Sequence, residues 1–283
     1  ALAGGGKRPA TLAFEITSSE APRLHFVFEG AGEASFARIV FLVRSGASLT
    51  LTESYLGGAG LTASVLEFDL ERGAKLNRTI FQRGGAGEAL AVTGIAHLGA
   101  EAEMTQTTLA FGAKVARMET RVVHQASGSK LNLNAAYLSG KGFHADITTN
   151  VRHGAPSCVT RQLTKGAVLD GGTGVFQGKF FVPRKTGQHT DADMQHQALL
   201  LEDGAQVFAK PELEIYADDV ECAHGNTCGA LDDAQMFYLR QRGIPETQAR
   251  AMLTEAFIAE ALGMADEAVR DVLLAEAQNW LSS

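Results

Sequence analysis

Two kinds of metal-binding side chain gather in one short stretch near the carboxyl end of the sequence. The segment ADDVECAHGNTCG, residues 217–229, contains Cys222, His224 and Cys228, although the whole chain has only 3 cysteines and 8 histidines. In an extended segment, residues i and i+2 point to the same side, so Cys222 and His224 could reach one ion or one partner surface. A thiolate with an imidazole suits zinc, iron or an iron-sulfur cluster better than calcium or magnesium.

This segment cannot complete a metal site alone. A structural zinc site needs four ligands, and the sequence has no second Cys/His pair at zinc-finger spacing. Either further ligands come from elsewhere in the chain or from another protein, or Cys222 is a small buried residue and His224 a hydrogen-bonding turn residue. Another hypothesis is a stand-alone metal-binding redox protein that uses Cys222, His224 and Cys228 together. The residues leave these alternatives open.

No other local motif indicates chemistry. The sequence lacks a P-loop, a GxSxG nucleophile elbow, an HExxH zinc motif and an EF-hand loop. The remaining histidines are dispersed, and Cys158 is expected in the core or in a strand. A carbohydrate-active enzyme on a repetitive β scaffold stays as an alternative, but it would need carboxylates or basic residues on adjacent coils. The 32 Asp and Glu residues show no such recurrent placement.

The composition predicts a globular chain with no nucleic acid or membrane partner. Hydrophobic residues make up 45% of the sequence, which can supply a real core. The formal net charge is -7 and the Lys and Arg residues are scattered, so no basic surface for nucleic acid is expected. No segment approaches the roughly 18 consecutive apolar residues that cross a bilayer. The odd number of cysteines fits a reducing compartment, and we expect a cytoplasmic protein.

Short alternating segments separated by glycine turns run from about Leu24 to Ile215. Leu49 and Leu51 alternate with threonines, for example, which indicates a half-buried strand. Five such segments begin with glycine, a small residue and then alternation, at Gly46, Gly73, Gly99, Gly112 and Gly128. Strands without intervening helices exclude a βαβ array, and the repeated start favours a β-solenoid over the alternative, an antiparallel sandwich.

After Asp218 the pattern becomes helical. Asp232 is a good N-cap, Gly243 occupies the position of a C′ glycine, and Pro245 is expected in the first turn of a second helix. The second helix has an apolar stripe of Ala249, Met252, Leu253, Ala256 and Phe257. A third segment carries Val269, Val272, Leu273, Trp280 and Leu281. We expect these stripes to pack on each other or on the β body, with a partner groove as the alternative.

These patterns divide the chain into three parts. Residues 1–20 are expected to be a linker or the remnant of a truncated N-terminal region. Residues 21–217 are expected to form the β-helix core, and residues 218–283 a small helical domain.

One long segment resembles a known family. The sequence KPELEIYADDVECAHGNTCGALDDAQMFYLRQRGI, residues 210–244, resembles the carboxyl-terminal signature of the SufB/SufD family of iron-sulfur cluster assembly proteins. The upstream GVFQGKFFVPRKTGQHTDADMQHQALLL, residues 174–201, resembles the same family. The ADDVxCxHG wording is similar to the SufD branch.

The resemblance implies a right-handed parallel β-helix followed by a helical C-terminal domain. It also implies a non-catalytic scaffold subunit of a complex with SufB and the ATPase SufC. An iron-sulfur cluster would then be shared with SufB, and none would reside in the isolated chain. When its partners are absent, the chain could pair with itself through the edge that would meet SufB.

Site residues follow from the same resemblance. His224 matches a residue that faces a SufB cysteine at the subunit interface, and Cys222 is its neighbour in the motif. The partner would supply the other thiolate and carboxylate ligands. The ATPase is expected to dock on the helices between Asp232 and Leu262, through Phe237, Tyr238, Arg240, Met252 and Phe257.

Overall fold

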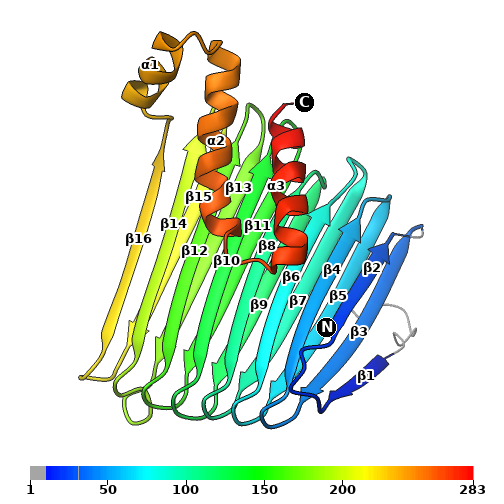
Figure 1. Ribbon diagram of the computed structural model, residues 1–283, viewed down its shortest axis with the longest axis vertical. Coiled ribbons are helices and arrows are strands. Elements are labelled where there is room, and N and C mark those ends of the chain that lie inside the picture. Colours follow the sequence, from blue (N-terminus) through cyan, green and yellow to red (C-terminus); the bar gives the residue numbers. More distant parts are fainter. Residues whose placement is uncertain (1–10, 31, 283) are drawn as a thin grey trace.

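The chain folds into a parallel β-solenoid of about eight turns, followed by three helices (Figure 1). The computed structural model describes residues 11–30 and 32–282. Each turn adds one strand to each of two sheets, and neighbouring strands within a sheet are parallel. The predicted solenoid is confirmed, and the antiparallel sandwich is excluded because it would need antiparallel pairs.

The odd-numbered strands form one sheet, which we call sheet A. In spatial order they are β1 (Thr11–Ile16), β3 (Ala34–Val43), β5 (Gly60–Leu70), β7 (Glu88–Leu98), β9 (Val115–His124), β11 (His144–His153), β13 (Thr173–Val182) and β15 (Gln206–Ile215). The even-numbered strands form sheet B. They are β2 (Arg23–Glu29), β4 (Ser48–Leu56), β6 (Lys75–Arg83), β8 (Glu103–Phe111), β10 (Lys130–Ser139), β12 (Val159–Val168), β14 (Asp191–Leu200) and β16 (Glu221–Gly229).

Both expected boundaries of the solenoid were too narrow. Strand β1 lies within the expected linker, because the alternating TLAFEI segment pairs in parallel with β3. Strand β16 was expected in the helical domain, but it belongs to the solenoid, because it pairs with β14. The part of the linker prediction that concerns residues 1–10 falls outside the described residues.

A stack of left-handed residues turns the chain from sheet A to sheet B. Gly46, Gly73 and Gly128 have φ of 71°, 65° and 75°, and Glu101 holds the equivalent corner with φ 59°. The corners are joined by hydrogen bonds, such as the one from the Gly46 N–H to the Arg72 carbonyl at 2.9 Å. Two of the five glycines in the sequence pattern do not belong to this stack. Gly99 precedes the corner, and Gly112 turns the chain the opposite way, from β8 to β9.

Alternating side chains fill the interior in rows, as the pleat requires. Phe41 lies between Phe14 and Phe68, with ring centroids 5.3 Å and 5.2 Å away. The interior also holds a buried ion pair. Arg78 Nε lies 2.5 Å from Glu53 Oε1, and both side chains have 0% exposure. Because a buried charge is costly unless it is paired and hydrogen-bonded, loss of either partner would destabilise the early turns.

Helices α1 (Asp233–Gln241), α2 (Glu246–Leu262) and α3 (Glu267–Leu281) follow the solenoid, and α2 and α3 lie on the outer face of sheet B (Figure 1). Asp232 caps α1 by accepting a hydrogen bond from the Gln235 N–H at 2.7 Å, and Gly243 has φ 81°, as predicted. Pro245 is the N-cap of α2 and not part of its first turn.

The predicted stripe of α2 is largely wrong. Only Ala249 of the five residues is fully buried, and Met252 is 42% exposed. The helix instead buries Ala249, Thr254, Ile258, Ala261 and Leu262. Small residues all around the helix allow two stripes, and the apolar outer face of sheet B selects the second. Val272 of α3, also assigned to a stripe, is 55% exposed.

An apolar layer and one buried lysine hold α2 on the sheet. The layer joins side chains of the sheet to Ile258, Ala261 and Leu262 of α2 and to Leu273 of α3. Lys165 of β12, whose side chain is 4% exposed, pairs with Glu260. Its ammonium also lies 4.2 Å from the centroid of the Phe257 ring. None of the helices in the described part of the chain is long and apolar enough to cross a membrane.

Candidate functional site

Strand β16 is the last strand of sheet B, and β14 is its only strand partner in the part of the chain that the structure describes (Figure 1). The register sets each alternate residue of β16 against a buried residue of β14. The pairs are Cys222 with Ala192, His224 with Met194, Asn226 with His196 and Cys228 with Ala198. These four β16 residues, which we call the terminal row, therefore end four interior rows of the solenoid.

The expectation that Cys222 and His224 share one side of an extended segment is confirmed by this strand. Cys222 is half-buried and packs against the interior, whereas His224 and Cys228 are exposed. Burial raises the pKa of the Cys222 thiol, and the negative charge of Asp191 raises it further. Burial also raises the pKa of Cys228. Because the thiolate is the metal ligand, both cysteines need a nearby cation to become good ligands at neutral pH.

The three candidate ligands do not converge on one point. A strand rises by about 3.3 Å per residue, so the Cα atoms of Cys222 and Cys228 lie about 20 Å apart. Across residues 11–30 and 32–282, no three His, Cys, Asp or Glu side chains lie close enough together to hold a metal ion. A single stand-alone site that uses Cys222, His224 and Cys228 is therefore excluded by the geometry. The terminal row can instead present Cys222 and His224 to ligands on another surface.

The sequence alone does not reveal that Asn226 bonds to the interior of the solenoid. Asn226 Oδ1 lies 2.7 Å from His196 Nδ1, and His196 Nε2 lies 2.9 Å from the Tyr137 hydroxyl. Alternation from His224 to Asn226 was visible in the sequence. The contact itself was not, because it depends on the register between strands that lie a full turn apart.

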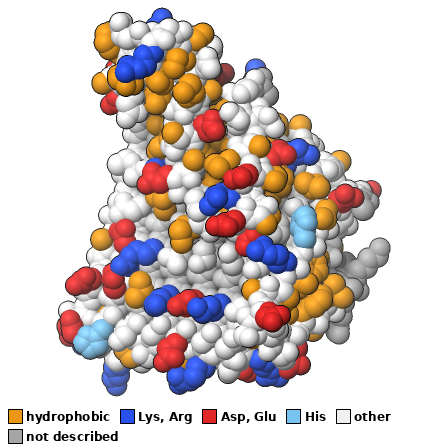
Figure 2. Space-filling model, viewed as in Figure 1, with side chains coloured by type: hydrophobic (Ala, Val, Ile, Leu, Met, Phe, Trp, Pro, Cys, Tyr) orange, Lys and Arg blue, Asp and Glu red, His pale blue; other side chains and the backbone are white. Residues whose placement is uncertain are grey.

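The expected docking residues fall on three parts of the helical surface. Phe237 and Tyr238 of α1 are 66% and 55% exposed, and the Arg242 guanidinium lies 3.6 Å from the Tyr238 ring centroid. Met252 faces a separate hollow between α2 and the end of α3. Phe257 is half-buried, and its ring faces the Lys165 ammonium where α2 packs on sheet B. Figure 2 shows hydrophobic side chains gathered over α1 and α2 at the top of the view.

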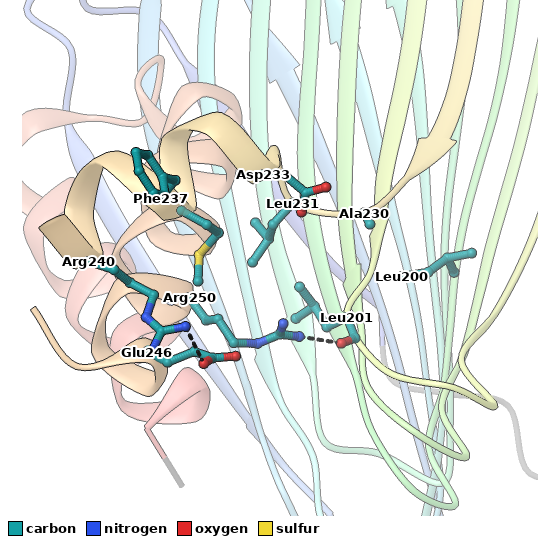
Figure 3. Close-up of a pocket in the computed structure, with 10 residues that line it drawn as sticks. Leu200, Leu201, Ala230, Leu231, Asp233, Phe237, Arg240, Glu246 and Arg250 are labelled. Atoms are coloured by element: carbon teal, nitrogen blue, oxygen red, sulfur yellow. Dashed lines mark hydrogen bonds and ion pairs between the residues drawn. The ribbon is translucent and has the colours of Figure 1, made fainter.

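A groove of about 360 Å³ lies between α1, the start of α2 and the ends of β14 and β16 (Figure 3). Its apolar wall includes Leu201, Leu231 and Phe237. Arg240 lies 2.9 Å from Glu246, and Arg250 donates a hydrogen bond to the Leu201 carbonyl (Figure 3). The groove thus combines an apolar wall with two arginines that are already oriented by partners of this chain.

Most of the chain matches one known protein family. Residues 26–257 match the family described as SUF system FeS cluster assembly, SufBD core domain. The chain is 39% identical over 165 residues to the iron-sulfur cluster assembly protein SufD of Escherichia coli, a match that covers 58% of this chain and 39% of that protein.

Two further relatives align over more of the chain. A SufBD family protein of Synechocystis is 32% identical over 242 residues, covering 80% of this chain and 52% of the relative. Protein ABCI7, chloroplastic, of Arabidopsis thaliana is 30% identical over 230 residues, covering 80% of this chain and 48% of the relative. The chain thus spans about half the length, or less, of these relatives. The chain belongs to the SufBD family of the SUF iron-sulfur cluster assembly system.

Proposed function

We propose that this chain is a non-catalytic scaffold subunit that pairs with a SufB-type paralogue and docks a SufC-type ATPase. The nascent iron-sulfur cluster is the cargo of the complex and forms at the junction of the paired subunits. His224, with Cys222 beside it, contributes from this side, and the paralogue contributes the remaining ligands. The observation that carries the proposal is the terminal row, which places these two residues on an edge strand.

The terminal turn has the properties of a subunit interface. Strand β16 offers an edge to which another strand can add, because among the described residues it is paired along one side only. On the neighbouring strand β15 and just after it, Phe208 and Tyr216 are 58% and 56% exposed. Aromatic residues are enriched at such interfaces. The same edge would allow a second copy of this chain to bind when the paralogue is absent.

The helical surface supports ATPase docking. Phe237, Tyr238 and Arg240 protrude from α1, and Met252 lies on the exposed side of α2. Aromatic and arginine side chains often contribute most of the binding energy at protein interfaces. Helix α1 buries none of its own residues and follows β16 after the short segment 230–232. A movement of α1 imposed by an ATPase would therefore pull directly on the strand that carries His224.

The cluster hypothesis is tested by anaerobic reconstitution of a co-expressed complex of this chain with a SufB-type and a SufC-type partner. His224→Ala is compared with wild type and with Thr227→Ala, an exposed residue of β16 outside the terminal row. Iron, sulfide and visible absorbance are measured on the purified complex. A shared site is supported if His224→Ala loses the cluster, Thr227→Ala keeps it, and all three subunits are still present in both complexes. Retention of the full cluster would make His224 a structural residue.

Docking is tested separately by measuring the affinity of this chain for the SufC-type ATPase in the absence of the SufB-type paralogue. Phe237→Asp is expected to weaken binding at least tenfold, because a charge would replace an exposed aromatic anchor. Val27→Asp is the matched control, since Val27 is 51% exposed but lies on β2 at the opposite end of the solenoid. Equal affinities of the two variants would refute the proposed docking surface.

A further inference from the structure

The terminal row is held in place by a chain of hydrogen bonds that begins deep inside the solenoid. It runs from Tyr137 on β10 to His196 on β14 and ends at Asn226 on β16. Tyr137 and His196 are fully buried, whereas Asn226 is exposed. The chain thus connects the packed interior to the edge where His224 and Cys222 lie.

Tyr137 has little freedom to move. Two glycines make space for its ring, Gly166 on β12 and Gly174 on β13. A Cβ atom at Gly166 would lie 2.1 Å from Tyr137 Cζ, and one at Gly174 would lie 2.4 Å from Tyr137 Cε2. Since real Cβ atoms do not approach so closely, only glycine fits at these two positions beside this ring.

His196 is fixed on its face and at both nitrogens. Its ring stacks on Phe176, with centroids 4.6 Å apart and an interplanar angle of 1°. Burial lowers the pKa of His196, so its imidazole is neutral. With Asn226 Oδ1 facing Nδ1, the proton lies on Nδ1 and is donated to Asn226. His196 Nε2 then accepts the hydrogen bond from the Tyr137 hydroxyl.

Strand β16 needs such an anchor because its sequence specifies register weakly. ECAHGNTCG contains two glycines and no large apolar residue, so burial of apolar side chains does little to fix the pairing. A slip of one residue would turn every side chain to the opposite face. We infer that Tyr137 and His196 are positioning residues: Tyr137 holds His196, and the hydrogen bond from His196 to Asn226 sets the register of β16 and so fixes where His224 and Cys222 lie at the end of the solenoid. The inference rests on the proposed function only for what those two residues then bind.

The inference is tested on the isolated chain, so that it can fail independently of the proposed cluster site. Hydrogen exchange is followed by mass spectrometry in peptides of β16 and, for comparison, of β12. Asn226→Ala removes the acceptor of this hydrogen bond, and His196→Phe removes its donor. His196→Phe still keeps an aromatic ring stacked on Phe176. Exchange in β16 should become roughly tenfold faster, the value of one lost hydrogen bond, with β12 unchanged.

Two further variants and a second measurement exclude a general loss of stability. Thr227→Ala should leave exchange unchanged, because this residue lies outside the terminal row. His196→Gln, which retains an N–H donor, should restore part of the protection. Alkylation of Cys222 should also speed up in Asn226→Ala, while that of buried Cys158 should not. Unchanged exchange of β16 in Asn226→Ala, or equal acceleration in β12, would overturn the inference.

Discussion

Acid should destabilise this protein through two histidines stacked inside the solenoid. The rings of His124 and His153 lie with centroids 4.9 Å apart, and both residues have 0% exposure. Both lie within hydrogen-bonding distance of Thr160 Oγ1, at 3.0 Å and 2.9 Å. Burial lowers the pKa of His124 to about 3, helped by its neighbour, and burial lowers the pKa of His153 to about 4.

The direction of the effect follows from proton binding. An unfolded histidine has a pKa of about 6.5, so below that pH the unfolded chain binds protons that the folded chain excludes. The stability that comes from keeping these two histidines neutral is fully present above the pKa of the unfolded histidines, and it is lost as the pH falls below that value. When the pH is lowered from about 7 to about 5, each histidine lowers the free energy of unfolding by about 2 kcal/mol, and the pair lowers it by about 4 kcal/mol.

Urea unfolding at several pH values measures this loss. The double variant His124→Asn, His153→Asn is less stable at neutral pH, but its free energy of unfolding should fall by about 4 kcal/mol less than that of wild type over the same range. His189→Asn, which changes an exposed histidine, is the matched control. If the double variant and wild type have the same pH dependence, the buried neutral pair is not the cause of acid sensitivity.

Three further predictions concern packing and capping. Arg78→Met leaves Glu53 buried without its partner and should cost about 3–5 kcal/mol in urea unfolding, most of which should return when Glu53→Leu is added. An equal loss in the double variant would contradict this. Gly166→Ala should cost about 1–3 kcal/mol because its methyl group meets the Tyr137 ring, and Tyr137→Leu in the same chain should reduce that cost. Asp232→Ala should destabilise α1 by about 1 kcal/mol, seen as faster amide exchange in that helix alone.

The architecture was predictable because the solenoid repeats its local signals. Alternation marked the strands, and glycines at Gly46, Gly73 and Gly128 marked the same corner. The exact turn length was hidden because Glu101 and Ser157 adopt positive φ without being glycine. At such corners the hydrogen bonds between turns outweigh the local preference of a single residue. A pattern of glycines alone therefore could not give the full register.

The buried face of α2 was not predictable, because its alanines make two apolar stripes almost equivalent. Ala249 belongs to both stripes, and the outer face of sheet B decides between them. Lys165 also favours the observed face of α2, because it pairs with Glu260 and its ammonium lies close to the ring of Phe257. A buried lysine on a strand gives no sign in the sequence of the helix that will cover it.

The two halves of the candidate site differ in the same way. Cys222 and His224 could be found from their spacing, but the role of Asn226 is visible only once β14 is in register beside it.

The contact between Asn226 and His196 also lies on the strand that a movement of the helices would reach first. Helices α2 and α3 are fixed to the sheet by an apolar layer, whereas α1 buries none of its residues and follows β16 directly. A displacement of α1 would therefore act first on β16, where the ladder to β14 and the hydrogen bond from His196 to Asn226 oppose it. Asn226 lies between α1 and His224 along the strand, so its hydrogen bond from His196 would limit how far a movement of α1 reaches His224.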